Sequence, residues 1–125
     1  HETIDKRMHY VHQNGREVFK FASTSMAAVS ADLLERNGLT GDVISLFVPH
    51  QANKRIIDGT VKRLNLPEDR VVINIDRYAN TAAGTIPIAL SEAVEQGRVK
   101  RGDTILLASA GAGYTWGSAL LTWTY

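Results

Sequence analysis

Apolar residues recur along this chain at two spacings, one typical of helices and the other of short strands. Between residues 17 and 37 they return every three or four positions, which predicts a long helix with Gly38 as its C-terminal cap. Two further helices are predicted over residues 52–64 and 82–96, the second ending at Gly97. The inward positions expected in the three helices are Val18, Ala22, Met26, Val29, Leu33 and Leu34; Ile56, Ile57, Val61 and Leu64; and Ile86, Ala89, Leu90, Ala93 and Val94.

Short apolar runs between these helices predict the strands. Residues 43–48 form a nearly continuous apolar run, as in a strand buried on both faces, and Pro49 ends it because proline cannot donate to the sheet. The other strands are expected at residues 8–13, 71–75, 104–108 and 118–124, with a turn at Asn14–Gly15 after the first. The chain therefore alternates short strands with helices.

This alternation favours an α/β fold with right-handed crossovers, a mostly parallel sheet and helices packed on the sheet. The last two predicted strands are joined through Ala110–Gly113, which leaves no room for a crossover helix. They should therefore pair antiparallel as a terminal hairpin. No internal repeat or low-complexity linker interrupts the pattern, so the chain is expected to form one unit.

Composition narrows the classes of function. At 125 residues the chain suits one domain or part of a larger one, and its net charge of +1 gives no support for wholesale nucleic-acid binding. No apolar run approaches the roughly 20 residues needed to cross a bilayer. The N-terminal residues lack the apolar core of a signal peptide, so the cytoplasm is the expected compartment. The absence of cysteine excludes disulfides, thiolate metal sites and a thiol nucleophile on this chain.

The candidate chemistry lies at two strand-to-helix junctions. His50 follows the run at residues 43–48, and Asn80 follows the run at residues 71–75. Parallel strands that end side by side would bring both side chains to one crevice, where open α/β sheets place their ligands. Each residue alone has a plainer explanation, as a structural histidine or as an asparagine that caps a helix. Together, a neutral imidazole and a carboxamide could donate hydrogen bonds to one developing negative charge, such as an enolate or thioester oxyanion.

Other motifs argue against dinucleotide binding, a histidine metal site and a serine nucleophile, and leave open a basic binding surface. The glycine loop at residues 111–117 lacks the dinucleotide-binding spacing, so we interpret it as a tight hairpin turn whose glycines let backbone amides approach a ligand. His9 and His12 have no carboxylate spacing for a metal, and no serine lies in a nucleophile elbow. A solvated helix surface or a basic patch beside the crevice would explain Lys20, Lys54, Arg55, Lys62 and Arg63.

Four runs carry a more specific signal: residues 15–20, 49–56, 80–83 and 111–120. In type and mutual spacing they are similar to motifs in the C-terminal half of β-ketoacyl-acyl carrier protein synthase III. These are the initiating condensing enzymes of bacterial fatty-acid synthesis, and they have a thiolase fold. The resemblance implies that residues 1–125 are a C-terminal thiolase-like domain, with the nucleophilic cysteine in an N-terminal half that this chain does not contain.

In that family a Cys-His-Asn triad performs the condensation. The resemblance implies that His50 takes the histidine role and Asn80 the asparagine role. Many members have three consecutive glycines in the loop that forms the thioester oxyanion hole, so an alanine there adds a methyl group to the acyl pocket. The remaining roles implied are Gly111, Ala112 and Gly113 in this oxyanion loop, Gly15 and Asn53 on the coenzyme A and pantetheine path, and Lys20, Arg55, Lys62 and Arg63 on the surface that docks the acidic carrier protein.

The resemblance also implies the partners. Acyl-CoA and malonyl-acyl carrier protein would be substrates, no separate cofactor or metal is expected, and the complete enzyme would be a homodimer. The missing half is expected on another chain, removed, or not included. Two alternatives stay open: a non-catalytic module that binds carrier protein or CoA, and a related polyketide-type condensing enzyme. Half of such a fold should expose a large apolar face, so the isolated chain is expected to associate with itself or a partner.

Overall fold

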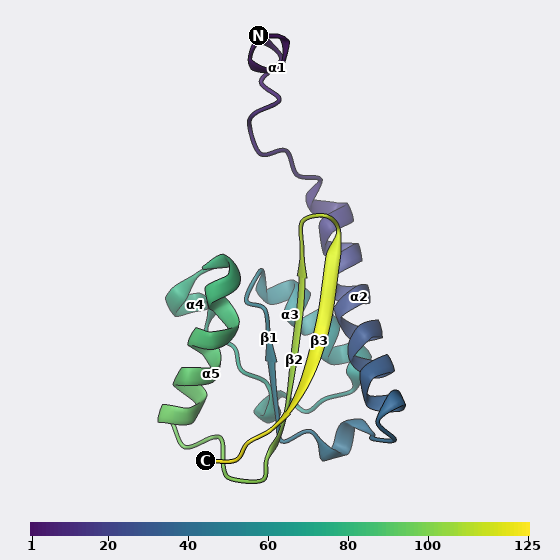
Figure 1. Ribbon diagram of the computed structural model, residues 1–125, viewed down its shortest axis with the longest axis vertical. Coiled ribbons are helices and arrows are strands. Elements are labelled where there is room, and N and C mark those ends of the chain that lie inside the picture. The colour runs from purple at the N-terminus through teal and green to yellow at the C-terminus, as the bar shows by residue number, and fades with distance from the viewer.

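The computed structural model describes residues 1–125, and its centre is a three-stranded sheet in the order β1-β2-β3 (Figure 1). β1 pairs parallel with β2, and β2 pairs antiparallel with β3, which confirms the predicted α/β class and terminal hairpin. The strands are β1 (Leu46–Pro49), β2 (Thr104–Gly111) and β3 (Thr115–Thr122). The helices are α1 (Glu2–Asp5), α2 (Gly15–Arg36), α3 (Lys54–Leu64), α4 (Ile75–Tyr78) and α5 (Thr85–Glu95), with single 3₁₀ turns at Gly41–Val43, Glu68–Arg70 and Ala82–Gly84.

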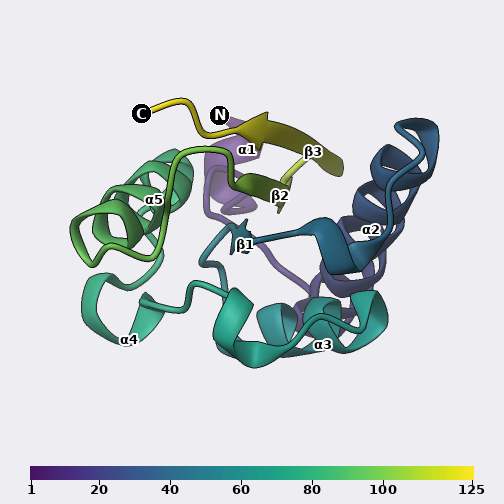
Figure 2. The same ribbon diagram turned by 90° about the horizontal axis from the view of Figure 1, so that it is seen from below.

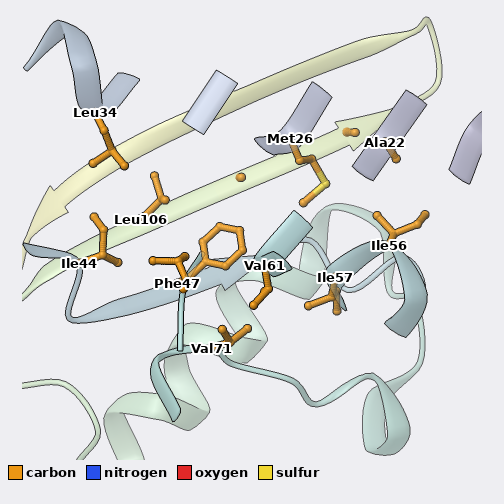
Figure 3. Close-up of a cluster of buried hydrophobic side chains, with 13 residues drawn as sticks. Ala22, Met26, Leu34, Ile44, Phe47, Ile56, Ile57, Val61, Val71 and Leu106 are labelled. Carbon is orange, nitrogen blue, oxygen red and sulfur yellow. The ribbon is translucent and has the colours of Figure 1, made fainter. Parts of the chain in front are cut away.

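Helices cover both faces of this sheet, with α2 and α3 on one side and α5 on the other (Figure 2). Side chains alternate along a strand, so neighbouring residues of β1 enter different cores. Phe47 is fully buried among side chains from α2, α3 and β2 (Figure 3), whereas Leu46 and Val48 pack against α5. Burying one such side chain stabilises the fold by about 1.5–3 kcal/mol. The run therefore contains a strand covered on both faces, as predicted, but the strand begins at Leu46 because Val43 ends a 3₁₀ turn, and Pro49 does not end it: Pro49 pairs with Ala108 and the ladder continues to His50.

The long helix α2 matches its prediction closely. Asn14 does not start a separate turn but caps the helix, because its Oδ1 accepts a hydrogen bond from the N–H of Glu17. Gly38 follows the helix with φ +66°, a left-handed conformation that favours glycine at a helix end. The inward positions predicted for α2 are mostly confirmed: Ala22, Met26 and Leu34 are buried, and Val18, Val29 and Leu33 are half-buried.

Two predicted strands are wrong, and one prediction of burial fails. Residues 8–13 form turns and irregular backbone with no strand beside them to pair with, and they lead from α1 to α2 away from the sheet (Figure 1). Residues 71–75 make only one parallel bridge, Val71 to Phe47, before α4 begins. Beyond that bridge the backbone N–H of Asn74 is taken by a side chain, so no ladder forms. Val94, predicted to point inward from α5, lies at the margin of the buried side of this helix and is 36% exposed.

β3 is the open edge of the sheet and is mostly exposed. It pairs with β2 alone, and it presents Trp116 and Leu121 to solvent, 53% and 37% exposed. Edge strands with unpaired backbone groups are surfaces on which another chain can pair. None of the helices is both long and apolar enough to cross a membrane.

Candidate active site

His50 is positioned by the end of β1. The backbone N–H of His50 donates to the carbonyl of Ala108 at 2.8 Å, which continues the parallel ladder one residue past Pro49. Its imidazole Nδ1 lies 2.5 Å from Oγ1 of Thr85, the first residue of α5. Burial lowers the pKa of His50 below its ordinary value, because the charged form loses its hydration. The imidazole is therefore neutral at pH 7, and a neutral imidazole donates one hydrogen bond.

Asn80 lies in a tight bend between α4 and α5. The residues on either side of this bend, Ala79 and Ala82, have φ of +56° and +51°, a strained conformation for alanine. Asn80 Oδ1 accepts a hydrogen bond from the N–H of Ala82 at 2.9 Å. Asn80 does not cap a helix, as its plain explanation predicted, because Thr81 precedes the 3₁₀ turn and Gly84 precedes α5; its side chain instead closes a local turn. This hydrogen bond at Oδ1 also orients the carboxamide. The Nδ2 group has no partner and is free to donate.

A single cavity of about 780 Å³ brings these two residues together at the carboxyl ends of β1 and β2. Both His50 and Asn80 line it, so the predicted shared crevice is present, although Asn80 reaches it from a bend after α4 and not from the end of a second strand. Its walls combine apolar side chains with a few polar groups, as in most small-molecule sites. The other predicted site residues that line it are Gly15, Asn53, Arg55, Gly111 and Ala112. Gly113, Lys20, Lys62 and Arg63 lie outside it.

The glycine loop is the turn of the β2–β3 hairpin, and only one of its glycines is needed for the turn itself. Gly113 has φ +141°, and a Cβ there would lie 2.8 Å from Cγ2 of Thr115. Thr115 Oγ1 also donates to the carbonyl of Ala112 at 3.0 Å, which closes the turn. A Cβ at Gly111 would meet only ordinary contacts, and a Cβ at Gly117 would meet nothing within 4 Å.

Replacing Gly113 with alanine is expected to lower the free energy of unfolding by at least about 2 kcal/mol, since it combines a disfavoured φ with a clash. Gly117→Ala in the same hairpin is the matched control and should change stability by no more than about 0.5 kcal/mol. Urea denaturation of both variants measures the difference. Equal stability of the two would show that the turn does not depend on glycine at residue 113.

The predicted docking cations do not all lie together. The guanidinium of Arg55 lies over the ring of Phe19 in α2, 5.4 Å from its centroid, beside the cavity. Arg63 donates to the carbonyl of Gly59 where α3 approaches α2, and Lys20 is exposed on α2. Lys62 instead lines a separate hollow of about 380 Å³, together with Lys54, which is paired with Asp58 at 2.9 Å.

A buried polar network ties the two junctions together, and the sequence interpretation missed it. Gln51, 1% exposed, donates to the carbonyls of Pro49 and Val72 at 2.9 and 3.1 Å and accepts from the N–H of Asn74 at 3.1 Å. The segment after β1 is thus joined to the residues that lead into α4 and Asn80. Gln51 stands inside a recognised motif, but nothing in the sequence indicated its partners.

The same network continues into α5. The Asn74 side chain donates to Glu92 at 2.9 Å, and Glu92 pairs with Arg77 of α4. The hydrogen bond from Asn74 and the Arg77 guanidinium hold the pKa of Glu92 below its ordinary value, so this carboxylate stays charged. α4 and α5 are therefore held at a fixed spacing around the bend that carries Asn80.

The mixed sheet with helices on both faces, and a histidine and an asparagine in one pocket at its carboxyl edge, define a thiolase-like α/β protein. Within that class, the profile described as 3-oxoacyl-[acyl-carrier-protein (ACP)] synthase III C terminal matches residues 34–123. The chain belongs to this family.

Individual relatives agree with this assignment. The β-ketoacyl-[acyl-carrier-protein] synthases III of Koribacter versatilis and Solibacter usitatus are 51% and 54% identical to this chain over all of its 125 residues. The solved structure of the synthase III from Thermus thermophilus is 55% identical, with a TM-score of 0.87, and the match covers 90% of this chain and 35% of that one. The chain spans 38% of the length of the two curated relatives.

Proposed function

We propose that this chain is the C-terminal part of a ketoacyl synthase III that condenses acyl-CoA with malonyl-acyl carrier protein and so starts fatty-acid synthesis. One observation carries the proposal: His50 and Asn80 line the same cavity, and each has a hydrogen-bonding group without a partner in this chain. Family membership supports the same reaction. The nucleophilic cysteine would come from the N-terminal part, because this chain has none.

In the proposed reaction the malonyl thioester loses its carboxylate as CO₂, and the electrons of the broken C–C bond form an enolate. Negative charge then develops on the thioester oxygen, where Nε2 of His50 and Nδ2 of Asn80 donate hydrogen bonds. Each such donor is worth about 3–4 kcal/mol of barrier when it is already in place. The enolate carbon attacks the acyl group on the cysteine, a C–C bond forms and the thiolate leaves.

The proposal also assigns roles to the other residues that line the cavity and to the cations near it. Gly111 and Ala112 would present backbone amides to the acyl thioester, with Gly113 holding the turn, and Gly15 and Asn53 would border the pantetheine arm. Arg55, Arg63 and Lys20 would receive the acidic carrier protein, while Lys62 lies toward a different hollow and would contribute less. The proposed enzyme works as a cytoplasmic homodimer without a separate cofactor.

The proposal is tested by supplying the missing part. This chain alone, incubated with radiolabelled acetyl-CoA, is expected to take up no stable covalent label. Co-expressed with the N-terminal part of the Solibacter usitatus relative, it should give a labelled complex that releases CO₂ from malonyl-carrier protein and forms the ketoacyl product. Stable label on this chain alone would contradict the assignment.

A matched pair of variants separates this enzyme from a binding module. Replacing the cysteine of the N-terminal part with alanine should abolish the label but keep CO₂ release, because decarboxylation uses His50 and Asn80. His50→Ala should abolish CO₂ release but keep the label. If His50→Ala left CO₂ release intact, the chain would instead be a module that binds carrier protein or CoA.

A further inference from the structure

The imidazole of His50 is held at one of its two nitrogens by a side chain from a distant part of the chain. Thr85 lies 35 residues away, is 2% exposed, and places its Oγ1 2.5 Å from Nδ1 of His50. The Thr85 hydroxyl makes no other hydrogen bond in the structure. Nε2, on the opposite edge of the ring, is the nitrogen left to act in the cavity.

The burial of Thr85 decides the direction of this hydrogen bond. If Nδ1 carried the proton and donated it, the hydroxyl hydrogen would be buried without an acceptor, which is costly. If the hydroxyl donates to Nδ1, both groups are satisfied and the proton of the neutral ring lies on Nε2. The first turn of α5, to which Thr85 belongs, also carries positive partial charge and disfavours a charged imidazole beside it.

We propose that Thr85 is a positioning residue that fixes His50 in the neutral tautomer with its proton on Nε2. His50 then presents a donor to the cavity before any substrate binds, and it pays no cost of tautomer exchange during the reaction. The effect on catalysis rests on the function proposed above, whereas the tautomer itself does not.

The tautomer can be read directly. This chain, labelled with ¹⁵N-histidine and bound to the unlabelled N-terminal part, has four histidines, and His50→Gln identifies which resonances belong to His50. In the unaltered complex Nδ1 of His50 is expected to resonate as an unprotonated nitrogen and Nε2 as a protonated one. Thr85→Val, which keeps the shape but removes the hydroxyl, should give a mixture of tautomers, and Thr85→Ser should restore the single tautomer.

Activity is measured on the same variants. Thr85→Val is expected to lower kcat for CO₂ release on the order of 10- to 100-fold with little change in KM, the loss typical when a group that orients an active histidine is removed. Thr85→Ser should recover most of it. A purely structural role would not link the tautomer to kcat or allow rescue by serine alone.

Distinct outcomes separate the two proposals. A protonated Nδ1 in the unaltered complex, or an unchanged tautomer in Thr85→Val, would overturn the inference. A changed tautomer with unchanged kcat would overturn the positioning role. If His50→Gln itself left CO₂ release intact, the proposed function would fail while the tautomer assignment stood.

Discussion

Replacing Asn80 with alanine in the complete enzyme is expected to lower CO₂ release from malonyl-carrier protein about 10²–10³-fold, the loss found when one oxyanion donor is removed. The reason is geometric. Asn80 lines the cavity and its Oδ1 is occupied by the N–H of Ala82, so the Nδ2 group is the part of the carboxamide left without a partner. Neutral amide hydrogens donate without titrating, so the loss should be similar across the working pH range.

A second substitution separates hydrogen-bond donation by Asn80 from its role in closing the local turn. Asn80→Asp keeps an oxygen that can accept from Ala82, but it removes the donor and adds a negative charge where the enolate forms. It should fold as stably as the unaltered protein and yet be at least as inactive as Asn80→Ala. CO₂ release and thermal unfolding, measured on both variants, give the answer. An aspartate variant with near-normal turnover would remove Asn80 from the mechanism.

Gln51→Leu is expected to lower the free energy of unfolding by an amount on the order of 3 kcal/mol or more. Leucine fills a similar volume but leaves three buried backbone groups unpaired: the N–H of Asn74 and the carbonyls of Pro49 and Val72. Each unsatisfied group costs about 1–3 kcal/mol. The free energy of unfolding from urea denaturation measures the total.

The matched control is Gln96→Leu, at the exposed C-terminal end of α5, which should stay within about 0.5 kcal/mol of the unaltered protein. Because Gln51 joins the segment after β1 to the one before Asn80, its loss should also weaken CO₂ release. If the two leucine variants proved equally stable, the buried network would not contribute to the fold.

Much of the fold could be predicted from spacing alone. The helical period places α2 and α5 within a few residues of their observed ends, and the few residues between β2 and β3 leave only an antiparallel hairpin. The shared cavity of His50 and Asn80 was also predicted, although the expected second strand is only one bridge long and Asn80 follows the short helix α4 instead of a strand. The short strand predicted at residues 8–13 was wrong because a short local pattern does not supply a partner strand.

The hydrogen-bond partners of polar side chains could not be predicted from the pattern of apolar and polar residues. Residues 71–75 have strong β propensity, yet Gln51 takes the N–H of Asn74 and ends the pairing after one bridge. The separation of Lys62 from Arg63 is similar: the two are adjacent in sequence, but one turns to the hollow at Leu66 and the other to the α2–α3 seam.

By itself the sequence determined the three long helices, the terminal hairpin, the junction that carries His50, and the lack of a thiol, since each depends on local spacing or composition. Only the tertiary structure decided which nitrogen of His50 is free to act. Thr85 lies 35 residues away and occupies Nδ1 of His50, and this hydrogen bond forms only after α5 has packed beside the end of β1, whereas the bond from the Ala82 N–H to Oδ1 of Asn80 is local.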